Sequence, residues 1–256
     1  MAKKKILLAG ESWVSTATHI KGFDQFATAT YHTGADELLA ALKESDFDVT
    51  FMPSHVAQRD FPQTMEALSA YDAVVLSDIG ANTLLLHPDT WIHSRPTPNR
   101  LRLLRDYVGN GGGLLMFGGY YSFQGINGGA RFHRTPIEDV LPVDCLSVDD
   151  RVEVPEGFAP VVSGSEQHPI LKGLGKDWPI LLGFNEVTVK PGAEVLATVS
   201  TDYGSLPLLV AGAYGKGRTV AWTSDVGPHW LPQTFIAWDG YKTLFEQMLA
   251  WATAKD

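Results

Sequence analysis

The chain has 256 residues, of which 45% are hydrophobic and 19% are charged, a composition typical of a folded globular protein. Its formal net charge of −9 at pH 7 argues against a nucleic-acid partner, because phosphate binding is driven by Lys and Arg. A single cysteine, Cys145, excludes an intrachain disulfide and any multi-cysteine metal site, and favours a cytoplasmic location. No apolar stretch approaches the roughly 18 residues of a membrane span, so we expect no membrane partner.

The first half of the chain predicts strands that alternate with helices. The expected strands are short apolar runs, and the expected helices carry apolar residues three and four positions apart. In chain order the strands are 5–9, 48–52, 72–77 and 114–117, and the helices are 34–44, 61–68 and 99–108. This alternation predicts an α/β fold, a mostly parallel sheet with helices on both faces.

Residues 83–99 are long and proline-rich for a simple connection between two elements. Loops of this length in compact domains are usually functional lids or interface elements. The segment therefore predicts either a cover over a ligand or a contact with a neighbouring subunit of a homo-oligomer.

After Pro142 the pattern changes to short β-type runs separated by Pro and Gly turns. These runs are 151–154, 186–189, 194–198 and 207–211. A glycine-containing hairpin turn at 214–218 leads into another strand, 219–223, and an amphipathic helix at 236–252 ends the chain. We interpret the chain as a single domain, 1–256, whose α/β core (1–142 and 213–256) is interrupted by a β-rich excursion, 143–212.

The most informative stretch is 111–129, GGGLLMFGGYYSFQGINGG. The apolar run 114–117 predicts a buried strand, and Gly118 and Gly119 allow a sharp turn where it ends. Ligands of open α/β sheets bind at the carboxyl ends of the strands, so this turn predicts a site. The glycines at 111–113 precede the strand and lie at the opposite edge, where a helix cap and a tight turn explain them. No GxGxxG follows the first strand and no phosphate loop occurs, so we expect no nucleotide cofactor and name none.

Polar and aromatic residues follow several of the expected strands. The candidate catalytic residues are Glu11, Ser122, Asp225 and His229, and the candidate ligand-binding residues are Trp13, Asp78, Gly118, Gly119, Tyr120 and Trp230. A carboxylate, a hydroxyl and an imidazole at one crevice would supply acid–base or nucleophilic catalysis. For any one of these residues taken alone, capping a helix or closing a turn is the more common role.

The remaining histidines show no HExxH or HxH spacing, so no metal site is expected. Cys145 lies in LPVDCLSV, a β-type context without a histidine nearby in sequence. Most such cysteines behave as inert small hydrophobes.

Taken in order, a set of motifs resembles the glutamine amidotransferase-like family, a bacterial group in the class I glutamine amidotransferase-like superfamily. The motifs are GESW, LSDIGAN with LLLHPDTW, GGGLLMFGGYYSFQG, TPIEDVLPV, HPIL, GKGRTVAWTSD and GPHW. The resemblance covers nearly the whole chain. It implies a flavodoxin-like α/β core, similar at fold level to trehalose-utilisation-type proteins that share the core without the glutaminase chemistry.

True class I amidotransferases carry a cysteine on the elbow after the equivalent strand, and a histidine and a glutamate beyond a later strand. In this chain the elbow falls at about 118–120 and has no thiol, and the His-x-Glu position falls near 223–225, where histidine is absent. A covalent glutamyl-enzyme then has no nucleophile. The resemblance therefore implies the fold and not the activity.

Three functions stay open at this point. The first is binding of a small polar metabolite, such as a carbohydrate, in a crevice lined by Glu11, Trp13, Asp78, Tyr120, Ser122 and His229. The second is a hydrolase in which Ser122 or an activated water acts with His229 and Asp225 or Glu11. The third is a structural or interaction subunit whose 83–99 loop builds the interface of a homo-oligomer.

Overall fold

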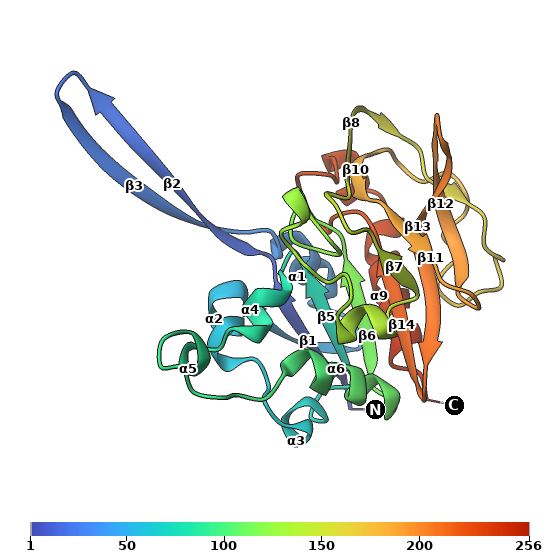
Figure 1. The fold of residues 1–256 in the computed structure, drawn as a ribbon. Coiled ribbons are helices and arrows are strands. Elements are labelled where there is room, and N and C mark those ends of the chain that lie inside the picture. Colours follow the sequence, from blue (N-terminus) through green and yellow to red (C-terminus); the bar gives the residue numbers. More distant parts are fainter. Residues whose placement is uncertain (1, 256) are drawn as a thin grey trace.

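The computed structural model describes residues 2–255 and contains a central sheet of eight strands (Figure 1). In spatial order the strands are β4 (Phe47–Pro53), β1 (Lys4–Gly10), β5 (Ala73–Ser77), β6 (Gly113–Phe117), β14 (Gly217–Trp222), β13 (Gly204–Tyr214), β12 (Glu194–Thr201) and β9 (Val161–Val162). The first five strands pair in parallel, and β13, β12 and β9 extend the sheet with antiparallel pairs. The predicted α/β fold class is confirmed.

Helices cover both faces of the sheet. They are α1 (Asp36–Leu42), α2 (Ser54–Asp60), α3 (Met65–Leu68), α4 (Ala81–Leu85), α5 (Pro88–Trp91), α6 (Arg100–Gly109), α7 (Pro136–Val140), α8 (Gln233–Ile236) and α9 (Gly240–Ala252), with a 3₁₀ turn at Ile126–Gly128. Strand β1 shows why two layers form, because Ile6 and Leu8 pack with α1 and α9 while Leu7 and Ala9 pack with α2, α4 and α6. Strands buried on both faces read as continuous apolar runs.

Three further sheets have two strands each. They are β2 (Ser12–Lys21) with β3 (Asp24–Thr33), β7 (Val143–Cys145) with β11 (Val187–Val189), and β8 (Arg151–Phe158) with β10 (Leu181–Asn185). In Figure 1 the β2–β3 hairpin projects from the body as a long arm, whereas β7, β8, β10 and β11 lie beside the antiparallel end of the central sheet. No helix between residues 2 and 255 is long and apolar enough to cross a membrane.

The structure differs from the predicted elements in several places, and α2 and α7 are helices that the sequence analysis did not predict. The predicted helix at 61–68 is wrong, because Phe61 ends α2 in an extended conformation and α3 begins only at Met65. Pro62 explains this break, since the residue before a proline is driven out of the helical region. The last helix begins at Gly240 rather than 236. The β2–β3 arm was not predicted at all.

The segment 83–99 contains the end of α4, all of α5 and an extended return to α6. Figure 1 places α5 at the side of the body rather than over the carboxyl ends of the strands. Trp91 and Ile92 are exposed there. The segment therefore does not cover the strand ends, and its role as an interface stays a prediction.

Candidate functional site

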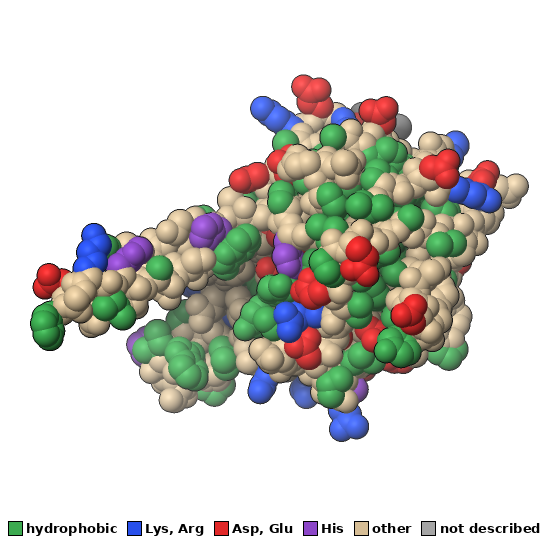
Figure 2. All heavy atoms as spheres, turned by 90° about the horizontal axis from the view of Figure 1, so that it is seen from above, with side chains coloured by type: hydrophobic (Ala, Val, Ile, Leu, Met, Phe, Trp, Pro, Cys, Tyr) green, Lys and Arg blue, Asp and Glu red, His purple; other side chains and the backbone are tan. Residues whose placement is uncertain are grey.

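The carboxyl ends of four parallel strands meet at one edge of the sheet. Gly10 of β1 pairs with Ser77 of β5, Ser77 pairs with Phe117 of β6, and Phe117 pairs with Trp222 of β14. The residues that follow these strands are therefore neighbours, as predicted from the chain order. Figure 2 looks onto this edge, where acidic, basic and histidine side chains are seen among apolar ones.

Glu11 lies at the centre of this edge and is buried. Its backbone adopts a φ of 46°, and its N–H donates to the Ser77 carbonyl over 2.9 Å. The Ser77 hydroxyl donates to Oε1 of Glu11 over 2.5 Å. A Cβ on Gly34 would lie 2.4 Å from Oε2 of Glu11, so a side chain at position 34 would require this carboxyl to shift. Burial, reinforced by Asp225 and Asp78, raises the pKa of Glu11 well above its usual range.

Asp78 follows β5 and also has a left-handed backbone, with a φ of 43°. Its Oδ1 accepts the N–H of Tyr121 over 2.6 Å. Burial and the nearby Asp225 raise the pKa of Asp78 to about 6, although the Tyr121 N–H partly opposes this shift. Glu11 and Asp78 are therefore carboxyls that hold their protons to unusually high pH. Such groups are found preferentially at functional sites.

His229 and Asp225 form a pair just beyond β14. Nδ1 of His229 lies 3.4 Å from Oδ2 of Asp225, whose other oxygen accepts the N–H of Val226 over 2.7 Å. Burial alone would lower the pKa of His229, but Asp225 outweighs this effect and the pKa is raised. His229 is also held at a φ of 153°, a conformation that non-glycine residues rarely adopt. Strain of this kind is concentrated at functional sites.

Tyr120 completes the aromatic side of the site. Its ring meets His229 edge-on at 4.4 Å, and the guanidinium of Arg151 lies 5.0 Å from the ring centroid. Trp230 stacks on His229 at 5.1 Å but is itself buried, with Nε1 donating to Glu153 over 3.0 Å. Trp230 therefore packs against the buried side of the His229 ring and helps to fix its position. This differs from its expected place on the ligand surface.

Two buried polar residues that the sequence did not suggest hold the glycine turn. Asn185, at the end of β10, accepts the N–H of Gly119 over 3.0 Å and donates to its carbonyl over 3.2 Å. The same amide donates to Asp150, which also accepts the N–H groups of Gln124 and Gly125. Gly118 approaches β14 so closely that a Cβ would lie 2.2 Å from the Thr223 carbonyl oxygen. The only sign of these two residues in the sequence was the change of pattern after residue 142. That change does not specify how the excursion 143–212 packs against the glycine turn after β6.

Ser122 lies on the same turn but faces inward. Its buried hydroxyl donates to the Phe117 carbonyl over 2.5 Å and accepts the N–H of Asp78 over 3.1 Å. Both hydrogen bonds fix the exit of β6 against β5. The structure thus gives Ser122 a positioning role, whereas the sequence left it open as one of two nucleophiles of a hydrolase, the other being an activated water.

Trp13 lies at the base of the arm, where its ring stacks on His32 at 5.2 Å. It lines a surface hollow together with His32, Thr33, Gly34, Asp36, Glu37 and Pro228. Gly34 contacts Glu11 and Pro228 precedes His229, so this hollow adjoins the carboxyl cluster. Trp13 is therefore at the rim of the site and not within it.

Cys145 is not on the turn after β6. It is buried in β7, which pairs with β11, and its N–H donates to Oε1 of Glu138 over 2.8 Å. The same Oε1 lies 3.1 Å from Nδ1 of His133, so an imidazole is nearer in space than the sequence suggested. Burial and the acidic side chains of Glu138 and Asp150 nevertheless raise the pKa of the Cys145 thiol well above its usual value. A raised pKa disfavours the thiolate that nucleophilic attack requires.

This environment predicts an unreactive thiol in the folded protein. At pH 8, a thiol-specific chromogenic disulfide reagent should react with the native protein at least about 100-fold more slowly than with the unfolded chain. An exposed comparator, Tyr203→Cys in a Cys145→Ala background, should react at the unfolded rate. Rapid labelling of native Cys145 would contradict the burial and the pKa argument.

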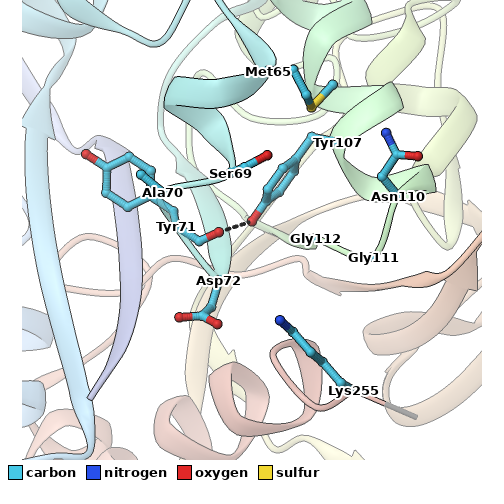
Figure 3. Close-up of a pocket in the computed structure, with 10 residues that line it drawn as sticks. All are labelled: Met65, Ser69, Ala70, Tyr71, Asp72, Tyr107, Asn110, Gly111, Gly112 and Lys255. Carbon is cyan, nitrogen blue, oxygen red and sulfur yellow. Dashed lines mark hydrogen bonds between the residues drawn. The ribbon is translucent and has the colours of Figure 1, made fainter. Parts of the chain in front are cut away.

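A separate hollow lies at the amino ends of the strands (Figure 3). The turn glycines Gly111 and Gly112 line it, as expected for a helix-to-strand connection. The Tyr107 hydroxyl donates to the Tyr71 carbonyl over 3.0 Å, and Asp72 accepts from Lys4 and from the N–H of Lys5. Two of the polar side chains that line this hollow, Tyr107 and Asp72, are thus paired within the chain, and we place the candidate site at the opposite edge, where titratable side chains converge. Between residues 2 and 255 no group of three or more His, Cys, Asp or Glu side chains is arranged to hold a metal ion.

This wound sheet, with its glycine turn after β6, defines a protein with the class I glutamine amidotransferase-like fold. The family described as "Putative glutamine amidotransferase" matches residues 5–254, and the chain belongs to this family. The resemblance stated from the motifs is thereby confirmed.

Solved structures agree with this assignment. A cytoplasmic protein of Salmonella typhimurium LT2 is 45% identical, with a TM-score of 0.91 over 98% of this chain and 100% of that chain. A second cytoplasmic protein of Salmonella typhimurium is 41% identical, with a TM-score of 0.91 over 98% of this chain and 99% of that chain. A "Putative thua-like protein" of Parabacteroides merdae is 15% identical, with a TM-score of 0.59 over 99% of this chain and 91% of that chain, which shows the fold alone. A comparison with curated proteins gave no match.

Proposed function

We propose that this chain binds a small polar metabolite, of the polyhydroxylated kind found in carbohydrates, at the carboxyl edge of the sheet. The observation that supports the proposal is the convergence of Glu11, Asp78 and Asp225 with His229 beside the ring of Tyr120. Carboxyl groups that hold protons can donate to one hydroxyl and accept from another. An aromatic face packs against the apolar side of a sugar ring, while a few convergent polar groups fix its orientation.

Glutaminase chemistry is not part of this proposal. Gly118, Gly119 and Tyr120 occupy the turn where a class I amidotransferase would carry its nucleophile. The chain's thiol is in β7 with a raised pKa, away from His229 and Asp225 in sequence and fold. We therefore expect the protein not to hydrolyse glutamine. We also expect Cys145→Ala to leave its behaviour toward glutamine unchanged. The two Salmonella relatives are cytoplasmic proteins, and we propose the same location for this chain.

The His229–Asp225 pair favours a second candidate, a hydrolase that activates water. A carboxylate beside Nδ1 orients an imidazole as a general base, and Glu11 with a raised pKa would supply the proton to a leaving group. With the Ser122 hydroxyl directed at Phe117, water is the more suitable nucleophile. In this case His229→Ala would abolish turnover while ligand binding and folding persist.

A thermal-shift screen of sugars, sugar acids and polyols tests the binding proposal. A ligand present at 100 times its Kd should stabilise the wild type by about 2.7 kcal/mol. Tyr120→Ala should weaken that ligand at least about tenfold, since it removes the aromatic wall. Tyr203→Ala, an exposed tyrosine in the turn before β13, is the matched control and should change nothing. Equal affinity in the Tyr120 variant, or no stabilising compound of this class, would reject the proposal.

A further inference from the structure

The β2–β3 arm contacts little of its own chain. Its two strands pair only with each other, over an unbroken register from Ser12 with Thr33 to Lys21 with Asp24. Every residue from 13 to 31 is exposed, and Figure 1 shows the arm standing clear of the body. A lone two-stranded hairpin is marginally stable in water. An arm of this length therefore needs a covering surface to be ordered.

The composition of the arm indicates that its surface is buried against another protein surface. Between residues 13 and 32 its formally charged side chains are Lys21 and Asp24, both at the tip, and it contains no proline or bulge. The exposed large apolar side chains are Trp13, Val14, Ile20, Phe23, Phe26 and Tyr31. Free edge strands in soluble proteins are normally protected by charges, prolines or bulges. This arm lacks these protections along its length.

A second copy of this chain fits the arm in charge and in symmetry. Lys21 at the tip carries a positive charge next to Asp24, whereas Asp36 and Glu37 line the hollow at the base of the arm beside Trp13. If two copies lie antiparallel about a two-fold axis, the tip of each arm meets the base of the other. The uncharged middle of each arm then contacts the same part of its partner. The arm contributes 20 strand residues, and because successive side chains of a strand point to opposite faces, about half of them would face the partner arm.

We infer that the β2–β3 arm is a dimerisation arm, and that two copies of this chain pair their arms tip to base. Each Lys21 lies against Asp36 and Glu37 of the other copy in this arrangement. Because the hollow at the arm base adjoins Glu11 and His229, the tip of one copy also closes the rim of the other copy's site. This inference is independent of which ligand the site binds.

Light scattering coupled to size-exclusion chromatography tests the dimer. The wild type should have twice the 27.9 kDa mass of one chain. A variant in which residues 15–30 are replaced by Asn-Gly, joining the paired residues Val14 and Tyr31, should be monomeric, with a cooperative unfolding transition that does not depend on protein concentration. A monomeric wild type at 50 μM, a dimer that survives arm removal, or an arm that binds lipid vesicles instead of a second copy would each overturn the inference.

The tip-to-base arrangement has its own test. Lys21→Glu should weaken the dimer at least about tenfold by placing an acid against Asp36 and Glu37, and adding Asp36→Lys with Glu37→Lys should restore it. In a Cys145→Ala background, Lys21→Cys with Glu37→Cys should form disulfides between chains under mild oxidation. The control pair Lys21→Cys with Glu66→Cys, on α3, should not. Equal cross-linking in both pairs, or no rescue by charge reversal, would contradict the arrangement.

Discussion

Replacing Asp78 by Asn is expected to stabilise the folded protein at neutral pH by up to about 3 kcal/mol. One pKa unit corresponds to about 1.4 kcal/mol, and the pKa of Asp78 rises from an ordinary 3.8 to about 6 on folding. The folded state thus holds a proton that the unfolded chain has already lost. The stability from that proton is complete below pH 3.8 and disappears as the pH rises through 6. The asparagine variant has no such loss.

Chemical denaturation at pH 4, 6 and 7.5 measures this difference. The two proteins should be nearly equal at pH 4, and the variant should exceed the wild type increasingly up to about pH 7. Asn can still accept the N–H of Tyr121, so the turn after β6 stays intact. Asp202→Asn, in the exposed turn between β12 and β13, is the matched control and should show no such trend. An Asp78→Asn variant less stable than wild type at pH 7.5 would mean that Asp78 is held ionised.

Replacing Gly10 by Ala is expected to destabilise the protein by at least about 3 kcal/mol and to abolish ligand binding. Gly10 has a φ of 122°, and an added Cβ would lie 1.7 Å from the Ser77 carbonyl oxygen. Backbone strain contributes about 1–2 kcal/mol, and the clash forces β1 and β5 apart where they deliver Glu11 and Asp78. Urea denaturation and the thermal-shift screen measure the two effects.

Gly192→Ala separates the two causes. Gly192 also has a positive φ, 84°, but an added Cβ would meet nothing within 4 Å. This variant should therefore lose only about 1–2 kcal/mol from backbone strain and keep its ligand affinity. Equal losses in both variants would show that the close approach of β1 to β5 contributes nothing.

Much of the fold could be predicted because strands and helices that are buried carry apolar residues in recognisable patterns. Runs such as Ala73–Ser77 and Leu114–Phe117 are apolar on both faces, and the structure buries them in the centre of the sheet. The β2–β3 arm escaped prediction for the opposite reason. Its residues are small, polar and aromatic without an apolar face directed at a core, because the arm contacts its own chain only near its base, where Tyr31 meets His55 edge-on. The periodicity of apolar residues predicts an element only where that element is buried against the rest of its own chain.

The candidate site was predictable in part. Glu11, Asp78, Asp225 and His229 follow strand ends, so chain order alone was enough to predict that they lie along one edge. Chain order could not predict side-chain direction, which is why Ser122 and Trp230 were expected on the ligand surface and are buried. Asn185 and Asp150 come from the β-rich excursion, and their place against Gly119 depends on tertiary packing that no local pattern specifies.

The central claim is that Glu11, Asp78 and Asp225 share one poorly hydrated site at the carboxyl edge of the sheet. A ¹³C NMR titration of the side-chain carboxyls tests it most directly. Asp78 should titrate near pH 6, and Asp78→Asn should lower the pKa of Glu11 by removing a neighbouring negative charge. If Glu11 and Asp78 both titrate near pH 4, and neither is affected by removal of the other, the claim is contradicted.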